Sequence, residues 1–364
     1  MRISRFAFYA LTTSIAACGG SVSSSPEGRP PSSGISSPAA ARCQPVAATL
    51  FTPEPGAILG GLALSGDTLY WTTLDATSSA GASTGSIWKG STCGGTATRL
   101  ASGRTKPHSV AVDGSTVLWV ENDASLARID VGGGDVTSVW SPAQSALDSY
   151  YLPPDVRLAA SAGHVYFSGL HLVCISADDC PQTAIVMDVD EHSGATRTLW
   201  SMATADVWYD IAADSEAVYV LPSDTSLLRM PKDGSPPVSI ATRSGGLYAE
   251  SVAVDGDAVD WFGLDGSDWG GFGYLRVATD GSGTQAVPLV KPDGLTRVVV
   301  GVDAGTIYFD VGNTDTYGSP QWKFDSVTSG GAPRALAQEN VASVAFDDHR
   351  LYYVAANCIQ AALK

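Results

Sequence analysis

The sequence predicts an all-β fold, a seven-bladed β-propeller of four-stranded antiparallel blades. One motif occurs seven times: a short apolar strand, an Asp/Gly/Ser turn and a second apolar strand that carries aromatic residues. The copies, such as LALSGDTLYW and VAVDGSTVLW, begin at Leu62, Val110, Leu158, Ile211, Val252, Val300 and Val344. They are therefore 48, 48, 53, 41, 48 and 44 residues apart. A repeat of about 40–50 residues with several short strands is typical of a propeller blade.

Each repeat continues with a second hairpin. In the second repeat, Leu126–Asp130 is followed by the Gly-rich turn Gly132–Gly134 and by the apolar segment Val136–Trp140. Gly-Gly and Asp-Gly sequences provide the positive φ values that tight hairpins need. Each blade should therefore contain strands A to D, with the A–B and C–D turns on one face of the ring and the B–C and D–A connections on the other.

The last repeat lacks its fourth strand, and the N-terminal part of the chain provides a candidate for it. After the segment Cys358–Leu363 the sequence ends at Lys364, whereas Pro45–Leu50 resembles the fourth strand Pro237–Ala241 of another repeat. We expect Pro45–Leu50 to complete the seventh blade, because closing the ring removes two sheet edges that could pair with other chains.

The repeats resemble those of the YWTD-type and NHL-type propellers. The resemblance depends on Leu69-Tyr70-Trp71-Thr72 and on the A-V-D-G turns at Asp113 and Asp255. It implies the fold and not a function. The sequence departs from the YWTD pattern in two ways: only the first copy contains Tyr-Trp-Thr, and YWTD-type propellers usually have six blades.

The first 17 residues have the features of a signal peptide, with Arg2 and Arg5 before a short apolar segment. Ile15-Ala16-Ala17-Cys18 resembles a bacterial lipobox, so Cys18 is the expected site of lipid attachment. An ordinary secretory signal is the alternative. Gly19 follows the cysteine, which by analogy with enteric bacteria favours the outer membrane of the cell envelope.

Three segments make up the predicted domain organisation. Residues 1–17 are the lipoprotein signal peptide, 18–42 are a flexible Ser/Pro-rich tether, and 43–364 form one β-propeller. The formal net charge is −16. With no basic stripe to neutralise phosphates, nucleic acid is excluded as a partner. We expect a monomer.

Five cysteines remain besides Cys18. Cys174 and Cys180 lie six residues apart beside Pro181, and we predict a disulfide between them. A metal pair is the alternative, but histidines at ligand spacing are lacking. Cys43 and Cys358 flank the ring closure, and a bond between them would clamp the ring, but counting along the hairpin places them near opposite ends of their strands, so the pairing of Cys43, Cys93 and Cys358 stays open. One thiol is left unpaired in any arrangement.

The long connections on one face are the expected binding region, because irregular loops on a rigid scaffold commonly carry function. They are Thr72–Gly85, Ser141–Pro154, Ser168–Thr183, Gly263–Phe272 and Asp310–Pro320. The recurring Asp residues in the opposite A–B turns are expected to form turns instead. Asp260 replaces an aromatic residue inside a strand, and we expect a local partner for its charge.

The residue five positions before each turn Asp should lie where strand A enters from the long-loop face, near the axis. Around this position blades 2 to 5 contain polar and aromatic side chains that would line one sector of the channel mouth. We predict a binding site there, to which the loop residue Trp269 is added: His108, Arg157, Trp208, Tyr209, Asp210, Tyr248, Glu250 and Trp269. These residue types suit a sugar, a peptide or acid–base chemistry. An ordinary polar channel rim is the alternative.

No catalytic motif is present in the sequence, and no cofactor is expected. Calcium could bind at Asp265 with Asp268, or at Asp310 with Asn313 and Asp315, although neither loop has EF-hand spacing. Two functional hypotheses follow. The first is a lipid-anchored propeller that binds a cell-envelope protein or glycan through the long-loop face. The second is a propeller enzyme in the central funnel, a lactonase-like hydrolase or polysaccharide lyase that could depend on calcium.

Overall fold

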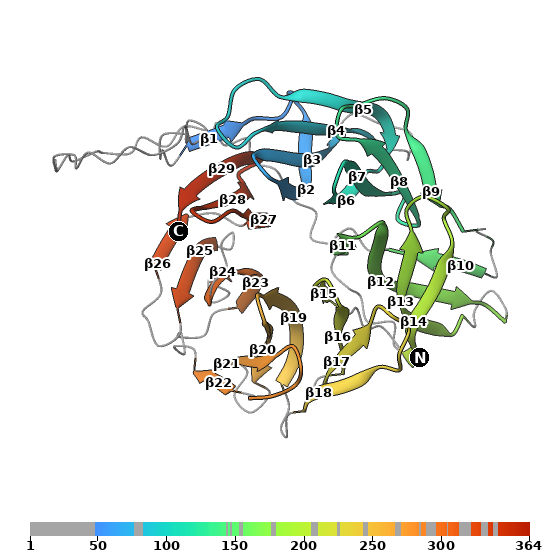
Figure 1. Ribbon diagram of the computed structural model, residues 1–364. Coiled ribbons are helices and arrows are strands. Elements are labelled where there is room, and N and C mark those ends of the chain that lie inside the picture. The colour runs from blue at the N-terminus through green and yellow to red at the C-terminus, as the bar shows by residue number, and fades with distance from the viewer. Residues whose placement is uncertain are drawn as a thin grey trace, which may run out of the picture. The chain divides into compact units, whose positions relative to one another are not determined.

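The computed structural model contains seven antiparallel sheets in a ring, as the sequence predicts (Figure 1). All described residues belong to the unit Cys43–Lys364. They are 48–75, 83–142, 145, 148–152, 156–175, 180–204, 210–223, 226–242, 247–265, 271–283, 285–288, 296–303, 305–312, 322–328, 334–337 and 341–364. Among them, no helix is long and apolar enough to span a bilayer.

Each blade is a sheet of consecutive strands, except the last. Blade 1 contains β2 (Ala57–Ser65), β3 (Thr68–Asp75), β4 (Thr84–Ser91) and β5 (Thr98–Thr105). Blade 2 contains β6 (His108–Asp113), β7 (Thr116–Glu121), β8 (Ser125–Asp130) and β9 (Thr137–Trp140). Blade 3 contains β10 (Asp148–Tyr151), β11 (Leu158–Ser161), β12 (His164–Val173), β13 (Gln182–Asp190) and β14 (Thr196–Thr204). Blade 4 contains β15 (Ile211–Ala213), β16 (Ala217–Ser223), β17 (Ser226–Pro231) and β18 (Val238–Thr242). Blade 5 contains β19 (Leu247–Asp255), β20 (Ala258–Asp265), β21 (Gly271–Ala278) and β22 (Gln285–Pro288). Blade 6 contains β23 (Thr296–Asp303), β24 (Thr306–Gly312), β25 (Trp322–Thr328) and β26 (Arg334–Ala337). Blade 7 contains β27 (Val341–Phe346), β28 (Arg350–Ala355), β29 (Cys358–Leu363) and β1 (Ala48–Phe51).

The N-terminal strand closes the ring, which confirms the prediction. β1 pairs antiparallel with β29, with Ala48 opposite Ala361 and Phe51 opposite Ile359. Phe51 is 6% exposed, and its ring stacks on Trp71 of blade 1 with 4.8 Å between the ring centroids. Each inner strand also contacts the inner strands on both sides, and β2 meets β27. The closure strand therefore joins blade 7 to blade 1 by hydrogen bonds and by apolar packing.

The hydrophobic core lies between neighbouring blades. Val117, Trp119 and Ile129 of blade 2, for example, pack in one buried cluster with Tyr70 and Ile87 of blade 1. Successive residues of a strand point to opposite sides of the sheet, and β7 is apolar at successive positions, with Val117 and Trp119 in one cluster and Leu118 and Val120 in the next, so the sheet presents an apolar side to both of its neighbours. This arrangement explains why one repeat alone could not bury its hydrophobic residues.

We call the face with the A–B and C–D turns the turn face, and here the predicted turn-forming role is confirmed for Asp214 and Asp347, whereas Asp113 and Asp255 accept amides of the next blade. Asp214 Oδ1 accepts hydrogen bonds from the amides of Glu216 and Ala217, both at 2.7 Å, while Oδ2 accepts the Tyr219 hydroxyl at 2.7 Å. Asp347 makes the corresponding bonds in blade 7. Burial opposes ionisation of Asp214, but the tyrosine hydroxyl and the amides outweigh it and lower its pKa.

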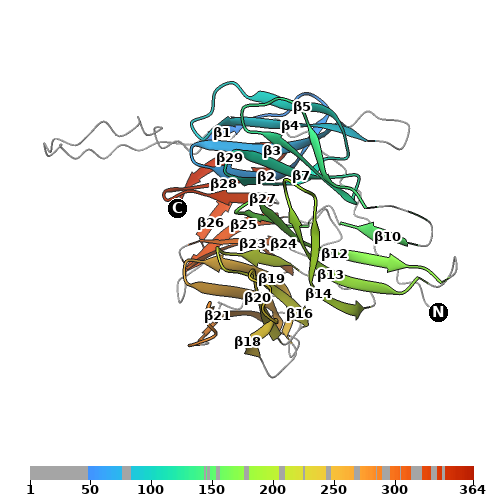
Figure 2. The ribbon, with the colours of Figure 1, turned by 45° about the vertical axis from the view of Figure 1, so that its right-hand side comes forward.

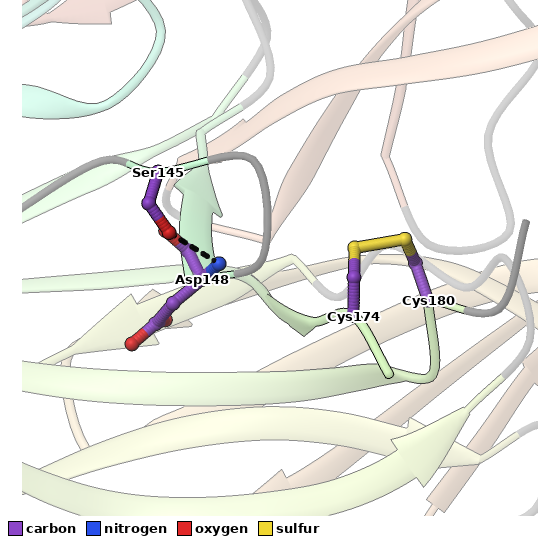
Figure 3. The surroundings of a disulfide bond; sticks show 4 residues. All are labelled: Ser145, Asp148, Cys174 and Cys180. Carbon is purple, nitrogen blue, oxygen red and sulfur yellow. Dashed lines mark hydrogen bonds between the residues drawn. A yellow bond between two sulfur atoms is a disulfide. The ribbon is translucent and has the colours of Figure 1, made fainter. Parts of the chain in front are cut away.

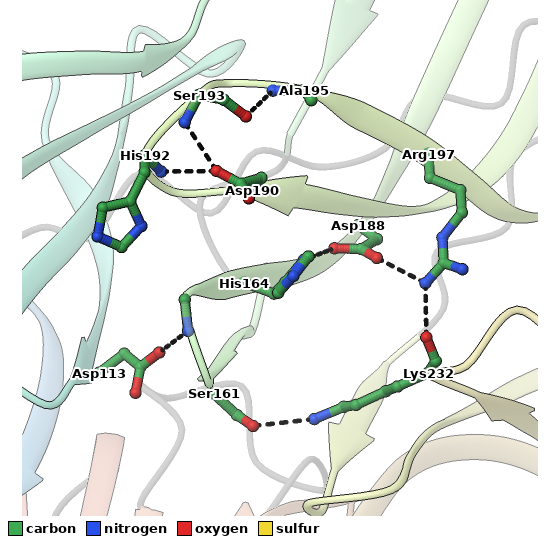
Figure 4. A network of polar contacts seen from close by, with 11 residues as sticks. Asp113, Ser161, His164, Asp188, Asp190, His192, Ser193, Ala195, Arg197 and Lys232 are labelled. Carbon is green, nitrogen blue, oxygen red and sulfur yellow. Dashed lines mark hydrogen bonds and ion pairs between the residues drawn. The ribbon is translucent and has the colours of Figure 1, made fainter.

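Polar contacts on the turn face also connect the blades (Figure 4). Asp113 of blade 2 accepts the Gly163 amide of blade 3 at 2.6 Å. Asp188 is bonded to His164 at 2.7 Å and to Arg197 at 2.8 Å, and Arg197 in turn donates to the carbonyl oxygen of Lys232 in blade 4 at 2.9 Å. On the turn face, polar side chains therefore connect blades 2, 3 and 4 by hydrogen bonds.

The opposite face, which we call the loop face, is irregular at blade 3. The segments Ser141–Pro154 and Ser168–Thr183 were expected to be loops, and this is wrong in part. β12 continues to Val173, and β10 pairs with its last residues in a register that runs from Asp148 opposite Val173 to Tyr151 opposite Leu170. The inner strand β11 pairs only with the first part of β12, so β10 occupies the edge that β11 leaves open.

A disulfide joins Cys174 to Cys180 at the tip of the β12–β13 hairpin, as predicted (Figure 3). Near it, the amide of Asp148 donates to Ser145 Oγ at 2.8 Å, at the start of β10. Cys93 and Cys358 are disulfide-bonded too, and none of the described cysteines is free. The expectation of one unpaired thiol among the five cysteines stays untested, because Cys43, like Cys18, lies outside the described residues.

Candidate functional site

The inner strands begin at the loop face with a recurring irregularity. In β2, β6, β19, β23 and β27 the register with the next strand shifts near the fourth to sixth residue before the A–B turn. In β6 the bulged residue is Ser109, which has a φ of 45° although it is not glycine. A Cβ atom on Gly61 of β2 would come within 2.9 Å of the Ser109 Cα atom. The inner strands of blades 1 and 2 therefore approach closely near the loop face.

Arg157 and Asp210, two predicted site residues, lie together. Arg157 Nη1 is 3.2 Å from Asp210 Oδ2 and donates to the carbonyl oxygen of Val252 at 3.2 Å. The same carboxylate oxygen accepts the Ser251 hydroxyl at 2.7 Å and the Val252 amide at 3.0 Å. Asp210 Oδ1 accepts the amide of Ile211 at 2.9 Å. These contacts connect the entrances of blades 3, 4 and 5, and 36% of the Arg157 side chain stays exposed.

His108 belongs to a second polar cluster, in blade 2. Its Nδ1 atom is 3.1 Å from Ser109 Oγ, and its Nε2 atom is 3.4 Å from Asp123 Oδ1. Lys106 Nζ lies 3.3 Å from the other oxygen of Asp123. The close approach of the His108 ring, aided by the charge of Lys106, lowers the pKa of Asp123. Only 8% of the His108 side chain is exposed, so two neighbours fix the orientation of its ring.

The other predicted site residues are placed only in part. Tyr248 and Glu250 belong to β19, and Glu250 lies at the bulge between Ala249 and Ser251. Trp208, Tyr209 and Trp269 lie outside the described residues. Of the predicted set, the structure thus brings Arg157 and Asp210 into contact and places His108 in a separate cluster.

Asp260 has the local partner that was expected. It is fully buried, and Arg276 Nη1 lies 3.2 Å from its Oδ2 atom. Arg276 also reaches Asp255 Oδ2 at 3.0 Å, and that oxygen accepts the amide of Gly305 in blade 6 at 2.8 Å. The charge in this strand is therefore part of a structural network near the turn face.

Asp310 is a buried acid of a different kind. Its Oδ2 atom accepts the amide of Val341 at 2.9 Å, and only 1% of the residue is exposed. Its Oδ1 atom has no hydrogen-bond partner among the described residues. Burial, together with the charge of nearby Asp325, raises the pKa of Asp310 to about 7.

The two calcium hypotheses fall mostly outside the described part of the chain. Asp265 is the last residue of β20 and Asp310 belongs to β24, whereas Asp268, Asn313 and Asp315 are not described. Within the described ranges, no group of three or more His, Cys, Asp or Glu side chains is placed to hold a metal ion.

Sequence analysis missed the exposed apolar side chains of blade 3. Ile175 is 77% exposed and Val173 is 47% exposed at the hairpin tip, and Met202 of β14 is 38% exposed. All three lie at loop-face ends, together with Ile58 of blade 1, whereas Val238 begins its strand at the turn face. The length of the hairpin was the missing information, because the segment before Cys174 had been assigned to a loop.

No protein-family model matches this chain, and no curated protein is similar to it. Among solved structures, it is similar to an oligogalacturonate lyase from Vibrio parahaemolyticus, with 11% identity, coverage of 84% of this chain and 91% of that chain, and a TM-score of 0.60. It is also similar to the Pyrococcus horikoshii acylaminoacyl peptidase, with 11% identity and a TM-score of 0.55; the match covers 82% of this chain and 49% of the peptidase. A third similar structure is the β-propeller domain of the Trilobed protease from Pyrococcus furiosus, with 10% identity and a TM-score of 0.52; the match covers 82% of this chain and 91% of that domain. At such identities the likeness shows the fold alone.

Proposed function

We propose that this protein is a lipid-anchored, extracytoplasmic β-propeller that binds a protein or glycan partner through its loop face. The difference between the two faces is the main support. On the turn face Asp214 caps its own turn and Asp113 bonds to the next blade, whereas the loop face presents Val173, Ile175 and Met202 to solvent. Several exposed apolar side chains on one blade of a rigid scaffold favour an interaction surface.

The lipid anchor is supported by the sequence. The lipobox-like segment ends at Cys18, and the Ser/Pro-rich segment 18–42 would hold the propeller away from the membrane. We propose the outer membrane as its location. Labelling cells with an alkyne-tagged fatty acid tests the anchor: we expect label in the wild-type protein and none in Cys18→Ala, and equal labelling of both would reject it.

Two pairs of substitutions test the interaction face. Val173→Asp with Ile175→Asp changes the loop face, and Val238→Asp with Leu363→Asp changes exposed apolar residues of the turn face. The full-length proteins are used to capture solubilised envelope components, which are identified by mass spectrometry. We expect the first pair to reduce capture of the specific partner at least tenfold and the second pair to leave it unchanged. Equal capture by both would contradict the proposal.

A second candidate function is an enzyme that uses the channel mouth. It is favoured by the ring of His108, whose two nitrogens face Ser109 and Asp123, because an oriented imidazole suits general acid–base chemistry. An assay with oligogalacturonate and with lactones, with and without added calcium, tests it. Turnover that His108→Gln abolishes while the thermal midpoint is preserved would support the enzyme; no turnover of any of these substrates would reject this candidate.

A further inference from the structure

Blade 3 carries a small sheet toward the loop face that has no counterpart among the described residues of the other blades. We call it the blade-3 extension: Asp148–Tyr151 of β10, 170–173 of β12, 182–185 of β13 and 201–204 of β14, paired in that order. β12 has ten residues, whereas the second strands of the other blades have six to eight. The strands β10, β12 and β13 extend to one side in Figure 2.

The two edges of the blade-3 extension differ. On one side the chain itself adds β10, which pairs with Leu170–Val173 of β12. On the other side β14 is the last strand, and no described strand pairs with its outer edge. A bulge at Leu199 separates the end of β14 from its first residues, and such a bulge bends a strand. Residues 201–204 thus form the part of this outer edge that lies beyond the bulge.

The end of β14 lacks the features that usually protect a sheet edge. Short length, charged residues and proline discourage pairing with other chains. The outer strands β9, β18, β22 and β26 have only four or five residues, and β5 has eight but contains Arg99 and Arg104. β14 has nine residues, and from Leu199 to Thr204 its sequence LWSMAT contains neither charge nor proline. Ser201, Met202 and Ala203 are all exposed.

We propose that the end of β14 binds an extended segment of another protein, which adds to the blade-3 extension as a further strand. This inference rests on the proposed function and names the partner class. In strand addition, main-chain hydrogen bonds provide affinity and alternate side chains provide specificity. Met202 would contact one side of the added strand, and the disulfide between Cys174 and Cys180 limits the loss of conformational freedom in the neighbouring hairpin.

Charge favours a different protein over a second copy of this chain. The formal net charge is −16, so two copies that met edge to edge would repel each other. An uncharged or basic segment would meet no such repulsion at an uncharged edge. The bound segment should therefore be extended, rich in β-branched residues and neutral to basic.

A random octapeptide phage library, selected on the full-length protein in detergent, provides the probe. The selected peptides are synthesised and their affinity is measured by fluorescence anisotropy. Met202→Lys places a charge on the edge, and Val238→Lys is the matched control, because it changes an exposed apolar residue on the outer strand of blade 4. Hydrogen–deuterium exchange locates the bound peptide. We expect at least tenfold weaker binding by Met202→Lys, unchanged binding by Val238→Lys, and slower exchange in residues 201–204.

Three results would overturn the proposal: no enriched peptide, equal affinity for Met202→Lys, or protection only outside β14. Dimerisation of the wild type that Met202→Lys abolishes, seen by sedimentation, would identify a second copy as the occupant and also overturn it. The proposed function is tested separately by the two double substitutions, at Val173 with Ile175 and at Val238 with Leu363. If the double substitution at Val173 and Ile175 reduces partner capture while the peptides bind Met202→Lys as tightly as the wild type, the result contradicts strand addition and leaves the proposed function intact.

Discussion

On the turn face, Asp214 and Asp347 each accept two backbone amides and a tyrosine hydroxyl, whereas on the loop face the tip of blade 3 presents Val173 and Ile175 to solvent. The same repeat produces both faces. Its A–B turn is fixed by a local pattern that recurs along the chain, while its B–C and D–A connections vary in length. Regular turns thus stabilise the ring, and the variable connections are available for recognition.

The comparison assumes one closed ring that carries both faces, and Phe51→Ala tests this most strongly. Phe51 packs on Trp71 and lies in the cluster that joins β1 to blade 1. Removing a buried Phe side chain costs about 3–5 kcal/mol of unfolding free energy. Urea denaturation measures the loss, with the exposed Thr49→Ala as the control. A loss below about 1 kcal/mol would mean that β1 does not hold the ring closed.

Buried acids distinguish the two faces through their response to pH. Asp260, toward the turn face, has Arg276 as a partner, whereas Asp310, toward the loop face, has no ion pair with a described residue. The carboxyl of Asp310 ionises near pH 4 when unfolded and near 7 when folded, so folding favours its protonated form. Its ionisation therefore reduces stability progressively as the pH rises from about 4 to about 7.

We expect Asp310→Asn to remove this penalty. Because three pKa units correspond to about 4 kcal/mol, the variant should gain up to about that free energy of unfolding at pH 8 and little at pH 4. Asp260→Asn should instead destabilise the protein, since it weakens the contact between this buried position and the half-buried Arg276. Denaturation curves at both pH values measure the effect. A wild-type stability that does not fall between pH 4 and 7 relative to Asp310→Asn would contradict the assignment.

Asp347→Ala tests whether the aspartate in a turn of the turn face stabilises the ring. The change leaves the amides of His349 and Arg350 and the hydroxyl of Tyr352 without their acceptor, and should cost about 1–3 kcal/mol. Burial opposes ionisation of Asp347, but these hydrogen bonds lower its pKa. Its contribution is therefore present above about pH 4 and decreases as the pH falls through the lowered value. The exposed neighbour Asp348→Ala is the control, and equal thermal shifts for both variants would refute the role.

Cys174→Ser with Cys180→Ser should have the smallest effect on stability and a larger one on recognition. The bond closes a short loop at the hairpin tip, so its loss should cost less than about 2 kcal/mol. Hydrogen exchange should become faster in residues 170–173 and 182–185, and partner capture should weaken. Unchanged exchange in the hairpin would show that the disulfide does not order the blade-3 extension.

The sequence predicted the features that local pattern determines. Seven copies of one motif predicted seven blades, the incomplete last repeat predicted the pairing of β1 with β29, and the spacing of Cys174 and Cys180 predicted their bond. β10 was not predicted, because the short segment Asp148–Tyr151 becomes a strand only where the end of β12 is free to pair.

The sequence predicted where in the repeat the candidate site residues lie, but it did not predict which residues they contact. The repeat placed Arg157 and Asp210 at the channel mouth, but Asp210 bonds to Ser251, which belongs to another blade 41 residues away. His108 contacts Asp123 of the β7–β8 turn, where Asn122 and Asp123 both adopt positive φ values. Such contacts depend on how neighbouring blades and turns meet, which periodicity along one strand does not specify.

Site-specific photo-crosslinking in living cells tests the central claim most directly. A photoreactive amino acid replaces Ile175 on the loop face or Val238 on the turn face, two exposed apolar positions of the same ring. The account predicts one specific cross-linked product from position 175, lost in Met202→Lys if strand addition holds, and none from position 238. A specific product from position 238 alone would contradict recognition through the loop face.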